Sequence, residues 1–183
     1  HRSDSIIGIG LGGAESSGPA RDYVEVFSVA RSVGLHVVAH AGEDAGPDSI
    51  DEAINKLGAE RIGHGISAIH NKDILNLLIT SSIPVECCPT SNIFTKSFVK
   101  TLQEHPLPLF LEKGINASLN TDDPAVFGVD LIDEYMNAYN LMGIKHSEII
   151  KLIYNGLNST FLSKQKKIAK WDEMNNIIKS FKS

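Results

Sequence analysis

The sequence predicts an α/β fold built on a parallel sheet, and three features of the chain indicate it. Short apolar segments without polar alternation recur five times, and most are followed by a stretch in which apolar residues return at helical spacing. Unalternated apolar segments are typical of strands buried on both faces, as in parallel sheets. Glycine and proline residues separate the segments. Strands that alternate with helices require crossover connections, which place the strands parallel in one sheet.

The first three strand–helix units lie between residues 5 and 80. We expect strands over 5–11, 35–40 and 61–64, and helices over 19–33, 47–57 and 71–80. Gly34 and Gly58 follow two of these helices, where glycine commonly ends a helix. Pro47 stands at the first position of a helix, where its missing N–H costs nothing.

The second part of the chain is expected to contain two more strands and then only helices. The strands are placed over 83–88 and 115–120, with a looser helical stretch over 96–113 that Pro106 and Pro108 interrupt. Helices are expected near 129–142, 147–158 and 164–181. Their apolar stripes include Leu131, Tyr135 and Tyr139, then Ile149, Ile150 and Ile153, then Ile168, Trp171 and Ile178. Lys164, Lys166, Lys167 and Lys170 are interpreted as a solvated helix face.

Composition restricts the function. The 183 residues include 17 basic and 22 acidic side chains, for a net charge of −5, which argues against a nucleic-acid-binding surface. No apolar run is long enough to span a membrane, and no secretory leader is visible, so we expect a cytoplasmic domain. The only cysteines, Cys87 and Cys88, are adjacent and are interpreted as buried strand residues rather than a disulfide framework.

Polar side chains follow the predicted strands where each strand ends. In parallel α/β folds, sites form at the carboxyl ends of strands, so these groups are expected to share one rim. The strand ends read Gly12-Gly13-Ala14-Glu15, His40-Ala41-Gly42-Glu43, His64-Gly65, Cys88-Pro89-Thr90-Ser91-Asn92 and Asn120-Thr121-Asp122-Asp123-Pro124.

Two histidines, a glutamate and paired aspartates at one rim form the inventory of a metal-assisted hydrolase. Imidazole and carboxylate are zinc ligands, and zinc lowers the pKa of a bound water toward neutrality. A carboxylate across the pocket can act as general acid, and a second histidine can act as base or orient the water.

The four rim motifs from residue 40 to residue 124 resemble the successive motifs of the adenosine deaminase family of (β/α)₈-barrel zinc hydrolases. The resemblance runs from about Ile6 to Tyr139 in order, and it implies that the chain is a partial (β/α)₈ barrel, comprising the last five βα units and the C-terminal helices. Residues 1–183 would then be the C-terminal portion of a single metal-dependent deaminase barrel domain. The motifs are His40-Ala41-Gly42-Glu43, Arg61-Ile62-Gly63-His64-Gly65, Cys88-Pro89-Thr90-Ser91-Asn92 and Ser118-Leu119-Asn120-Thr121-Asp122-Asp123-Pro124.

The resemblance also implies roles for individual residues. His40 and Asp122 would bind Zn²⁺. Glu43 would protonate the purine ring at N1, and His64 would orient or deprotonate the attacking water. Asp123 would hydrogen-bond N7, and the backbone at Gly13 would approach the ring near N3. The zinc deaminases of the cytidine type are excluded, because no His-x-Glu followed by Pro-Cys-x-x-Cys occurs.

The sequence departs from the family in two respects. The His-x-His pair that supplies two further zinc ligands on the first strand is absent, and five strands are expected where a complete barrel of about 250 residues has eight. We therefore expect the chain, which begins at His1, to lack three βα units and to need this N-terminal barrel segment as a partner. The inner faces of Val37, Ile62 and Val85 are expected to lose the side chains that fill the barrel centre.

The sequence is compatible with several functions. The first is hydrolytic deamination of adenosine to inosine and ammonia. Deamination of free adenine or of a modified nucleoside such as aminodeoxyfutalosine is an alternative, because Gly10 and Ala14 stand where well-known adenosine deaminases carry an acidic residue. An inactive half-barrel or binding module, and a barrel metallohydrolase acting on an amide or ester, are the others.

The remaining histidines are interpreted without a catalytic role. His36 is expected to pack within the second strand. His70, His105 and His146 stand in loop-like contexts, where surface or helix-capping positions are expected.

Overall fold

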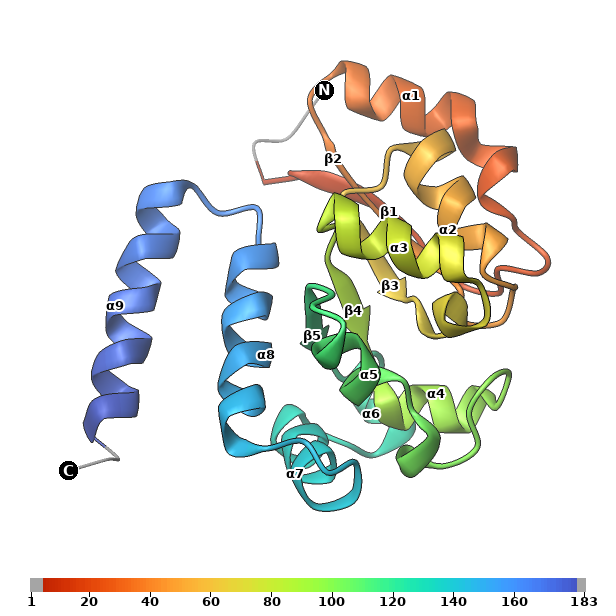
Figure 1. Ribbon diagram of the computed structural model, residues 1–183. Helices are drawn as coiled ribbons and strands as arrows, with labels where there is room; N and C mark the ends of the chain where they lie inside the picture. The colour runs from red at the N-terminus through yellow and green to blue at the C-terminus, as the bar shows by residue number, and fades with distance from the viewer. Residues whose placement is uncertain (1–4, 181–183) are drawn as a thin grey trace.

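One parallel sheet of five strands organises the protein, as seen in the computed structural model, which describes residues 5–180 (Figure 1). The strands lie in the sheet in the same order as in the chain, and every neighbouring pair is parallel. Within the described residues, the first and fifth strands form the two edges of the sheet. The α/β class and the five predicted strands are confirmed. The strands are β1 Gly8–Leu11, β2 His36–Ala41, β3 Arg61–His64, β4 Val85–Cys87 and β5 Ala117–Leu119.

Helical segments follow each strand, and α1, α2 and α3 lie together against one face of the sheet (Figure 1). Helix α8 packs against β5, and α9 packs against α8. The segments up to β5 are η1 Ala20–Tyr23, α1 Val24–Ser32, α2 Asp48–Glu52, η2 Ala53–Leu57, η3 Ile66–His70, α3 Lys72–Ser81, α4 Pro89–Thr95, η4 Leu102–Glu104 and α5 Leu107–Glu112. Those after β5 are α6 Pro124–Phe127, α7 Leu131–Leu141, α8 His146–Ser159 and α9 Lys164–Ser180, so residue 181 of the last expected helix lies outside the described residues.

Side-chain caps fix where two of these helices begin. The Asn71 side chain accepts hydrogen bonds from the backbone N–H groups of Asp73 and Ile74 at the start of α3. Asp130 and Asp133 form a reciprocal capping box at the start of α7. Both arrangements satisfy backbone donors that have no partner inside the helix.

The segment between β4 and β5 differs from the looser helical stretch expected over 96–113. A helix, α4, already begins at Pro89, directly after β4, and ends at Thr95. Two short segments, η4 and α5, then replace the expected continuous stretch. Pro106 precedes α5 and Pro108 lies in its first turn, where a missing N–H costs no helical hydrogen bond, so the prolines mark the start of α5 rather than interrupting it. The start of α4 is important for the site, since its first turn carries buried polar residues.

Val37, Ile62 and Val85 were expected on the face of the sheet that looks toward the barrel centre, but they lie on the opposite face. These side chains are fully buried in the core beneath the helices. The alternating positions, His40, Gly63 and Glu86, lie on the open face and line a cavity of about 280 Å³. Successive strand residues point to opposite faces of a sheet. Assigning one residue of a strand to the wrong face therefore places its alternate residues on the wrong face too.

Helix α7 also turns a different face inward from the one its apolar stripe indicated. Of the predicted stripe, Tyr135 packs against the core, but Leu131 and Tyr139 are exposed, whereas Glu134 and Ala138 are fully buried. The Glu134 carboxylate accepts a hydrogen bond of 3.0 Å from the backbone N–H of Thr90 in α4. This contact determines which side of α7 packs against the rest of the protein, and the apolar pattern does not reveal it.

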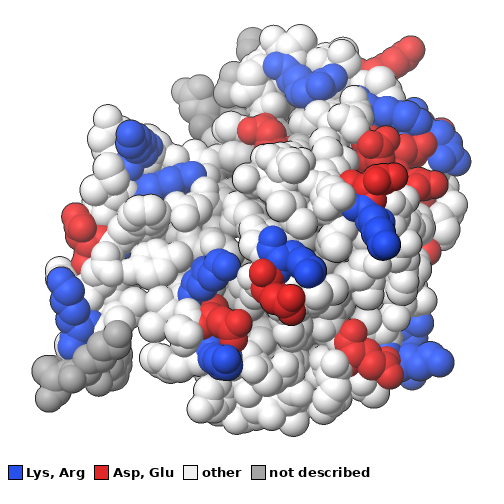
Figure 2. All heavy atoms as spheres, viewed as in Figure 1, with Lys and Arg blue, Asp and Glu red and all other residues white. Residues whose placement is uncertain are grey.

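Charged side chains of both signs are interspersed on the face shown in Figure 2. On α9, Lys164, Lys166 and Lys170 are exposed, as expected for a solvated helix face, and Lys170 pairs with Glu173. Lys167 differs, because it is half-buried and donates a hydrogen bond to the Asn158 carbonyl in α8. Among the described residues, no helix has both the length and the apolar character needed to cross a membrane.

Candidate active site

The carboxyl ends of the five strands bring the predicted polar residues to one edge of the sheet. His40 lies near the end of β2, Glu43 follows it in the next turn, and His64 is the last residue of β3. Asp122 comes from the segment after β5, and Gly13 from the segment after β1. The parallel arrangement gathers groups that are up to 109 positions apart in the printed sequence.

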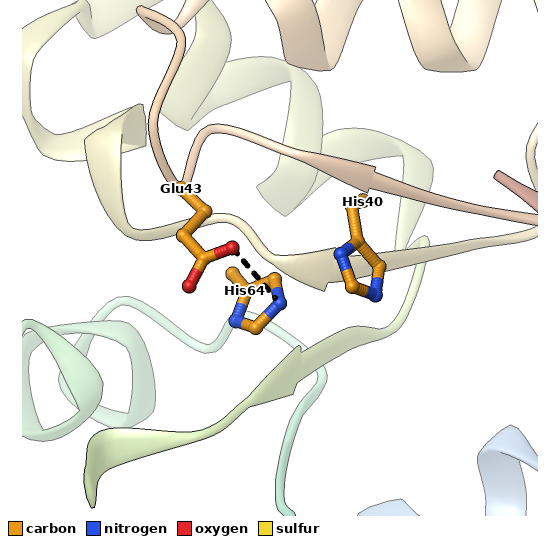
Figure 3. Close-up of side chains that lie close together, drawn as sticks. All are labelled: His40, Glu43 and His64. Atoms are coloured by element: carbon orange, nitrogen blue, oxygen red, sulfur yellow. Dashed lines mark ion pairs between the residues drawn. The ribbon is translucent and has the colours of Figure 1, made fainter. Parts of the chain in front are cut away.

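His40, Glu43 and His64 form the centre of this cluster (Figure 3). One donor atom from each lies within 4.8 Å of the others, which is a spacing at which a metal ion can be shared. His64 Nε2 lies 3.4 Å from Glu43 Oε2. The His40 and His64 rings meet edge to face, with centroids 4.5 Å apart.

Asp122 adjoins this cluster on the side of His64. Its Oδ2 atom lies 4.0 Å from His64 Nε2 and accepts a hydrogen bond of 2.7 Å from Ser91 Oγ. Asp122 and His40, the two predicted metal ligands, line the same cavities. The tightest group of possible ligands in the described residues, however, is His40 with Glu43 and His64.

His40 is held in a setting that suits a metal ligand. Its Nδ1 atom is buried and has no hydrogen-bond partner among the described residues, although buried polar atoms are normally satisfied. The ring lies across the neighbouring strand at Gly63, where an added Cβ would come within 2.9 Å of His40 Cδ2. Only glycine leaves room for the ring at this position. The residues therefore fit a bound cation such as zinc, which takes imidazole and carboxylate ligands.

Two site residues adopt a backbone conformation that is uncommon outside glycine. His64 has a φ of 67° and Asp122 a φ of 59°, both in the left-handed region. Such conformations cluster at functional sites, where the surrounding structure holds them in place. Here they turn both side chains toward the same rim.

Five of the six predicted site residues share one cavity. A cavity of about 430 Å³ is lined by Gly13, His40, Glu43, Asp122 and Asp123, together with Phe127 and others. His64 lines an adjoining cavity of about 190 Å³ with His40 and Asp122. Gly13 has a φ of 88°, and nothing lies within 4 Å of the position its Cβ would take, so its backbone is open to the cavity.

Burial and neighbouring charge favour neutral forms of Glu43 and His64. Burial, followed by the charges of Glu15 and Asp122, raises the pKa of Glu43 to about 7. Burial, followed by the charge of His40, lowers the pKa of His64 to about 4. At neutral pH the His64 ring is therefore neutral and Glu43 is partly protonated, so the contact drawn dashed in Figure 3 is not a full ion pair. A carboxyl group with this pKa is available as a proton donor at neutral pH.

Glu15 is a site residue to which the sequence analysis gave no role. Its buried carboxylate accepts hydrogen bonds of 3.0 Å from the backbone N–H groups of both Glu43 and Ala45. A second hydrogen bond joins the same two loops with the roles exchanged: Asp44, after β2, accepts the N–H of Ser16, after β1. The two loops after β1 and β2 are thus held together around Glu43. The position of Glu15 directly after the glycine-rich end of β1 is the sequence signal that could have indicated it.

Asn92 and His105 are also buried at the site, and for His105 the expected surface position is wrong. His105 is 3% exposed, and its Nε2 atom lies 3.2 Å from Asn92 Oδ1. Its Nδ1 atom accepts the N–H of Leu107, so it does cap α5. Asn92 Nδ2 in turn lies 3.2 Å from Glu43 Oε1 and 3.1 Å from His64 Nδ1.

His70 and His146 are exposed and the cysteines are buried, as expected. For His36 the expected packing is found only in part: its ring stacks on Phe161 at a centroid distance of 3.8 Å, but its side chain is 38% exposed and lies 3.0 Å from Glu60. Cys87 and Cys88 are free and buried, and burial raises the pKa of both thiols, which keeps them unreactive.

Comparisons with known proteins agree with this geometry. The family model described as adenosine deaminase matches residues 1–177. Adenosine deaminase of Klebsiella pneumoniae (strain 342) is 47% identical over 169 residues, which is 92% of this chain and 50% of the relative. The crystal structure of adenine deaminase from Arthrobacter aurescens is 34% identical with a TM-score of 0.91, and the match covers 95% of this chain and 53% of that one.

A further solved structure, the N6-methyl-AMP deaminase from Arabidopsis thaliana, is 28% identical with a TM-score of 0.75. Its match covers 96% of this chain and 50% of that one. The chain thus spans about half the length of the curated relatives it matches.

Proposed function

The chain belongs to the adenosine deaminase family, and we propose that it forms the catalytic rim of a zinc-dependent hydrolase that converts adenosine and water to inosine and ammonia. The observation that carries the proposal is the cavity of about 430 Å³, which five of the six predicted site residues line together. The sixth, His64, is in contact with Glu43. The remaining part of the barrel is expected to come from an N-terminal segment beyond these residues.

His40 and Asp122 would hold the metal. When bound, zinc supplies a nucleophile by lowering the pKa of water toward neutrality. The buried, unpartnered Nδ1 atom of His40 and the spacing of the donor atoms support this assignment. Two protein ligands are fewer than the three or four usual for zinc, so tight binding requires further ligands from the N-terminal segment.

The other residues act on the purine and on the attacking water. Glu43 donates a proton to N1 of the ring, which makes C6 more electrophilic. His64 holds the water near Glu43 and Asp122. Asp123 hydrogen-bonds N7, and the open backbone at Gly13 approaches the ring near N3. Glu15 fixes the backbone of Glu43 and so sets the direction from which the proton is delivered.

Deamination of a related adenine compound is the second candidate. It is favoured by the likeness to an adenine deaminase and by Gly10 and Ala14, which replace acidic residues of well-known adenosine deaminases. The chemistry at the purine would be the same, because the residues that face the ring are the same. The choice depends on contacts to the sugar side, which the N-terminal segment is expected to supply.

A substrate panel tests the proposal. The full-length protein that contains this chain is loaded with zinc and assayed for ammonia release from adenosine, adenine and aminodeoxyfutalosine, and for methylamine release from N6-methyl-AMP. Hydrolysis of a simple amide and of an ester is followed alongside by the acid that each releases. Turnover of adenosine above the others is the expected result, and turnover mainly of another adenine compound would move the assignment to the second candidate. Hydrolysis of the amide or ester without any adenine turnover would show that the site is a different metallohydrolase.

A further inference from the structure

We propose that Asn92 and His105 are positioning residues that fix the ring tautomer of His64, so that His64 carries its proton on Nε2 and acts as a hydrogen-bond donor at the site. The proposal deepens the proposed function, and its consequence for turnover rests on that function. The tautomer itself does not, because it follows from the hydrogen-bond geometry. Three hydrogen-bonding steps connect the start of α5 to the site.

The first step fixes the tautomer of His105. The backbone N–H of Leu107 points at His105 Nδ1 over 3.1 Å, and a backbone N–H can only donate. Nδ1 must therefore be the acceptor and carry no proton. Burial lowers the pKa of His105 to about 3, so the ring is neutral at physiological pH and has a single proton, on Nε2.

The second step fixes the orientation of the Asn92 amide. His105 Nε2 donates its proton to Asn92 Oδ1 over 3.2 Å. The carbonyl end of Asn92 is thereby directed at His105, and the NH₂ end is directed at the site. The reverse orientation would set two N–H donors, the Asn92 NH₂ group and His105 Nε2–H, against each other. Asn92 is fully buried, so no solvent can relieve such a conflict.

The third step transfers this orientation to His64. Asn92 Nδ2 has two protons and two acceptors within reach, Glu43 Oε1 at 3.2 Å and His64 Nδ1 at 3.1 Å. Each proton has one partner, so the group is fully satisfied. Because His64 Nδ1 accepts from the NH₂ group, it carries no proton, and the ring proton lies on Nε2.

The consequence concerns the two roles left open for His64. Nε2 is the atom that lies 3.4 Å from Glu43 Oε2 and 4.0 Å from Asp122 Oδ2. With a proton on this atom, neutral His64 donates a hydrogen bond toward the attacking water and cannot accept a proton there. We call the chain of hydrogen bonds from Leu107 through His105 and Asn92 to His64 the relay. It assigns His64 to orienting the water rather than to deprotonating it.

Nitrogen NMR measures the tautomer directly. The full-length protein is labelled with [¹⁵N]histidine, and long-range ¹H–¹⁵N correlations identify which ring nitrogen carries the proton. His64 and His105 are assigned by the signals lost in His64→Gln and His105→Gln. We expect the proton on Nε2 in both rings. A proton on Nδ1 of His64 in the unaltered protein would overturn the proposal, whatever substrate the enzyme uses.

Variants test whether Asn92 and His105 cause this state. Asn92→Asp replaces the NH₂ donor by an acceptor, so the His64 proton should move to Nδ1, and kcat should fall about 10- to 100-fold, as for other outer-shell partners, with KM less affected. His105→Leu should leave His64 in a mixture of tautomers, whereas His105→Gln, which keeps an N–H donor, should restore the Nε2 form.

Asn71→Asp is the matched control, because aspartate caps α3 as well as asparagine does and lies outside the site. The His64 tautomer should be unchanged in this variant. A folded Asn92→Asp variant that keeps the proton on Nε2 of His64 would show that the relay does not set the tautomer. If both rings carry the proton on Nε2 but the unaltered protein turns over no adenine compound, the result would count against the proposed function. The role of Asn92 and His105 in setting the tautomer would still hold.

Discussion

Glu43 is the residue whose surroundings are most clearly adapted to proton transfer. Its backbone N–H is held by Glu15, one carboxylate oxygen meets Asn92, and the other meets His64. Burial and the nearby negative charges of Glu15 and Asp122 raise its pKa to about 7. His40 differs in kind, because its buried Nδ1 atom has no partner among the described residues. The two residues should therefore respond differently to substitution.

Glu43→Gln should retain zinc and lose most turnover in the full-length enzyme, because the amide cannot donate the carboxyl proton. The expected loss in kcat is about 10²- to 10⁴-fold, the usual contribution of a general acid. His40→Ala should lose both zinc and turnover. Zinc content by elemental analysis and the rate of ammonia release distinguish the two variants, and turnover of Glu43→Gln close to that of the unaltered enzyme would remove the acid role.

The residues proposed to bind substrate or metal are easier to find from sequence than those that support them. His40, Glu43 and Asp122 stand at strand ends and have side chains suited to the chemistry, so their types and positions indicate them. Glu15, Asn92 and His105 act through hydrogen bonds to residues 28, 49 and 13 positions away. Such contacts depend on how the loops fold over the rim, and no local pattern records them.

At the scale of elements, α4 and α7 are joined by a buried carboxylate. Glu134 on α7 is fully buried and accepts the Thr90 N–H at the start of α4. Burial raises the pKa of Glu134, so the folded protein binds this proton more tightly than the unfolded chain does. The stability that the protonated form contributes is present below the unfolded pKa of about 4.3 and is lost as pH rises through the raised folded pKa.

Glu134→Gln should therefore show a pH-dependent gain in stability. The glutamine keeps an oxygen acceptor for Thr90 and never becomes charged. Urea unfolding of the full-length protein should give similar free energies for both forms near about pH 4, and a higher value for the variant at about pH 8. Glu173→Gln on the exposed face of α9 is the control and should change little. A variant that is less stable than the unaltered protein at both pH values would contradict the role of burial.

The order and type of the elements could be predicted more fully than their packing faces. Strand β3 was predicted with the observed bounds, and β4 and β5 are each shorter than expected by two residues at the start and one at the end. The apolar pattern of α7 was misleading because Glu134 is buried through a hydrogen bond. Val37, Ile62 and Val85 were assigned to the wrong face of the sheet, because the sequence of a strand that is apolar on both faces does not indicate which face meets the helices.

At the scale of the whole molecule, the sheet is open. Within the described residues, β1 and β5 are edge strands, and His40, Gly63 and Glu86 line a cavity on the uncovered face. Unpaired edges with apolar side chains invite pairing with another chain. The chain spans about half of its curated relatives, which agrees with a sheet that other strands complete.

Residues 1–183 expressed alone should accordingly associate or bind a complementary segment, hold zinc weakly and show no turnover. Light scattering gives the mass in solution, and zinc content and ammonia release are measured on the same sample. A monomer that melts cooperatively, holds one zinc ion and deaminates adenosine would contradict the proposal that further ligands lie in an N-terminal segment.

The central claim is that the strand ends of this chain form one zinc site, and anomalous X-ray diffraction at the zinc edge tests it most directly. Crystals of the zinc-loaded full-length protein should show a single strong peak at the rim, about 2.0–2.2 Å from a ring nitrogen of His40 and from a carboxylate oxygen of Asp122. Glu43 and His64 should lie beside the peak, facing the cavity. A peak elsewhere, or a zinc ion at the rim that contacts neither His40 nor Asp122, would contradict the account.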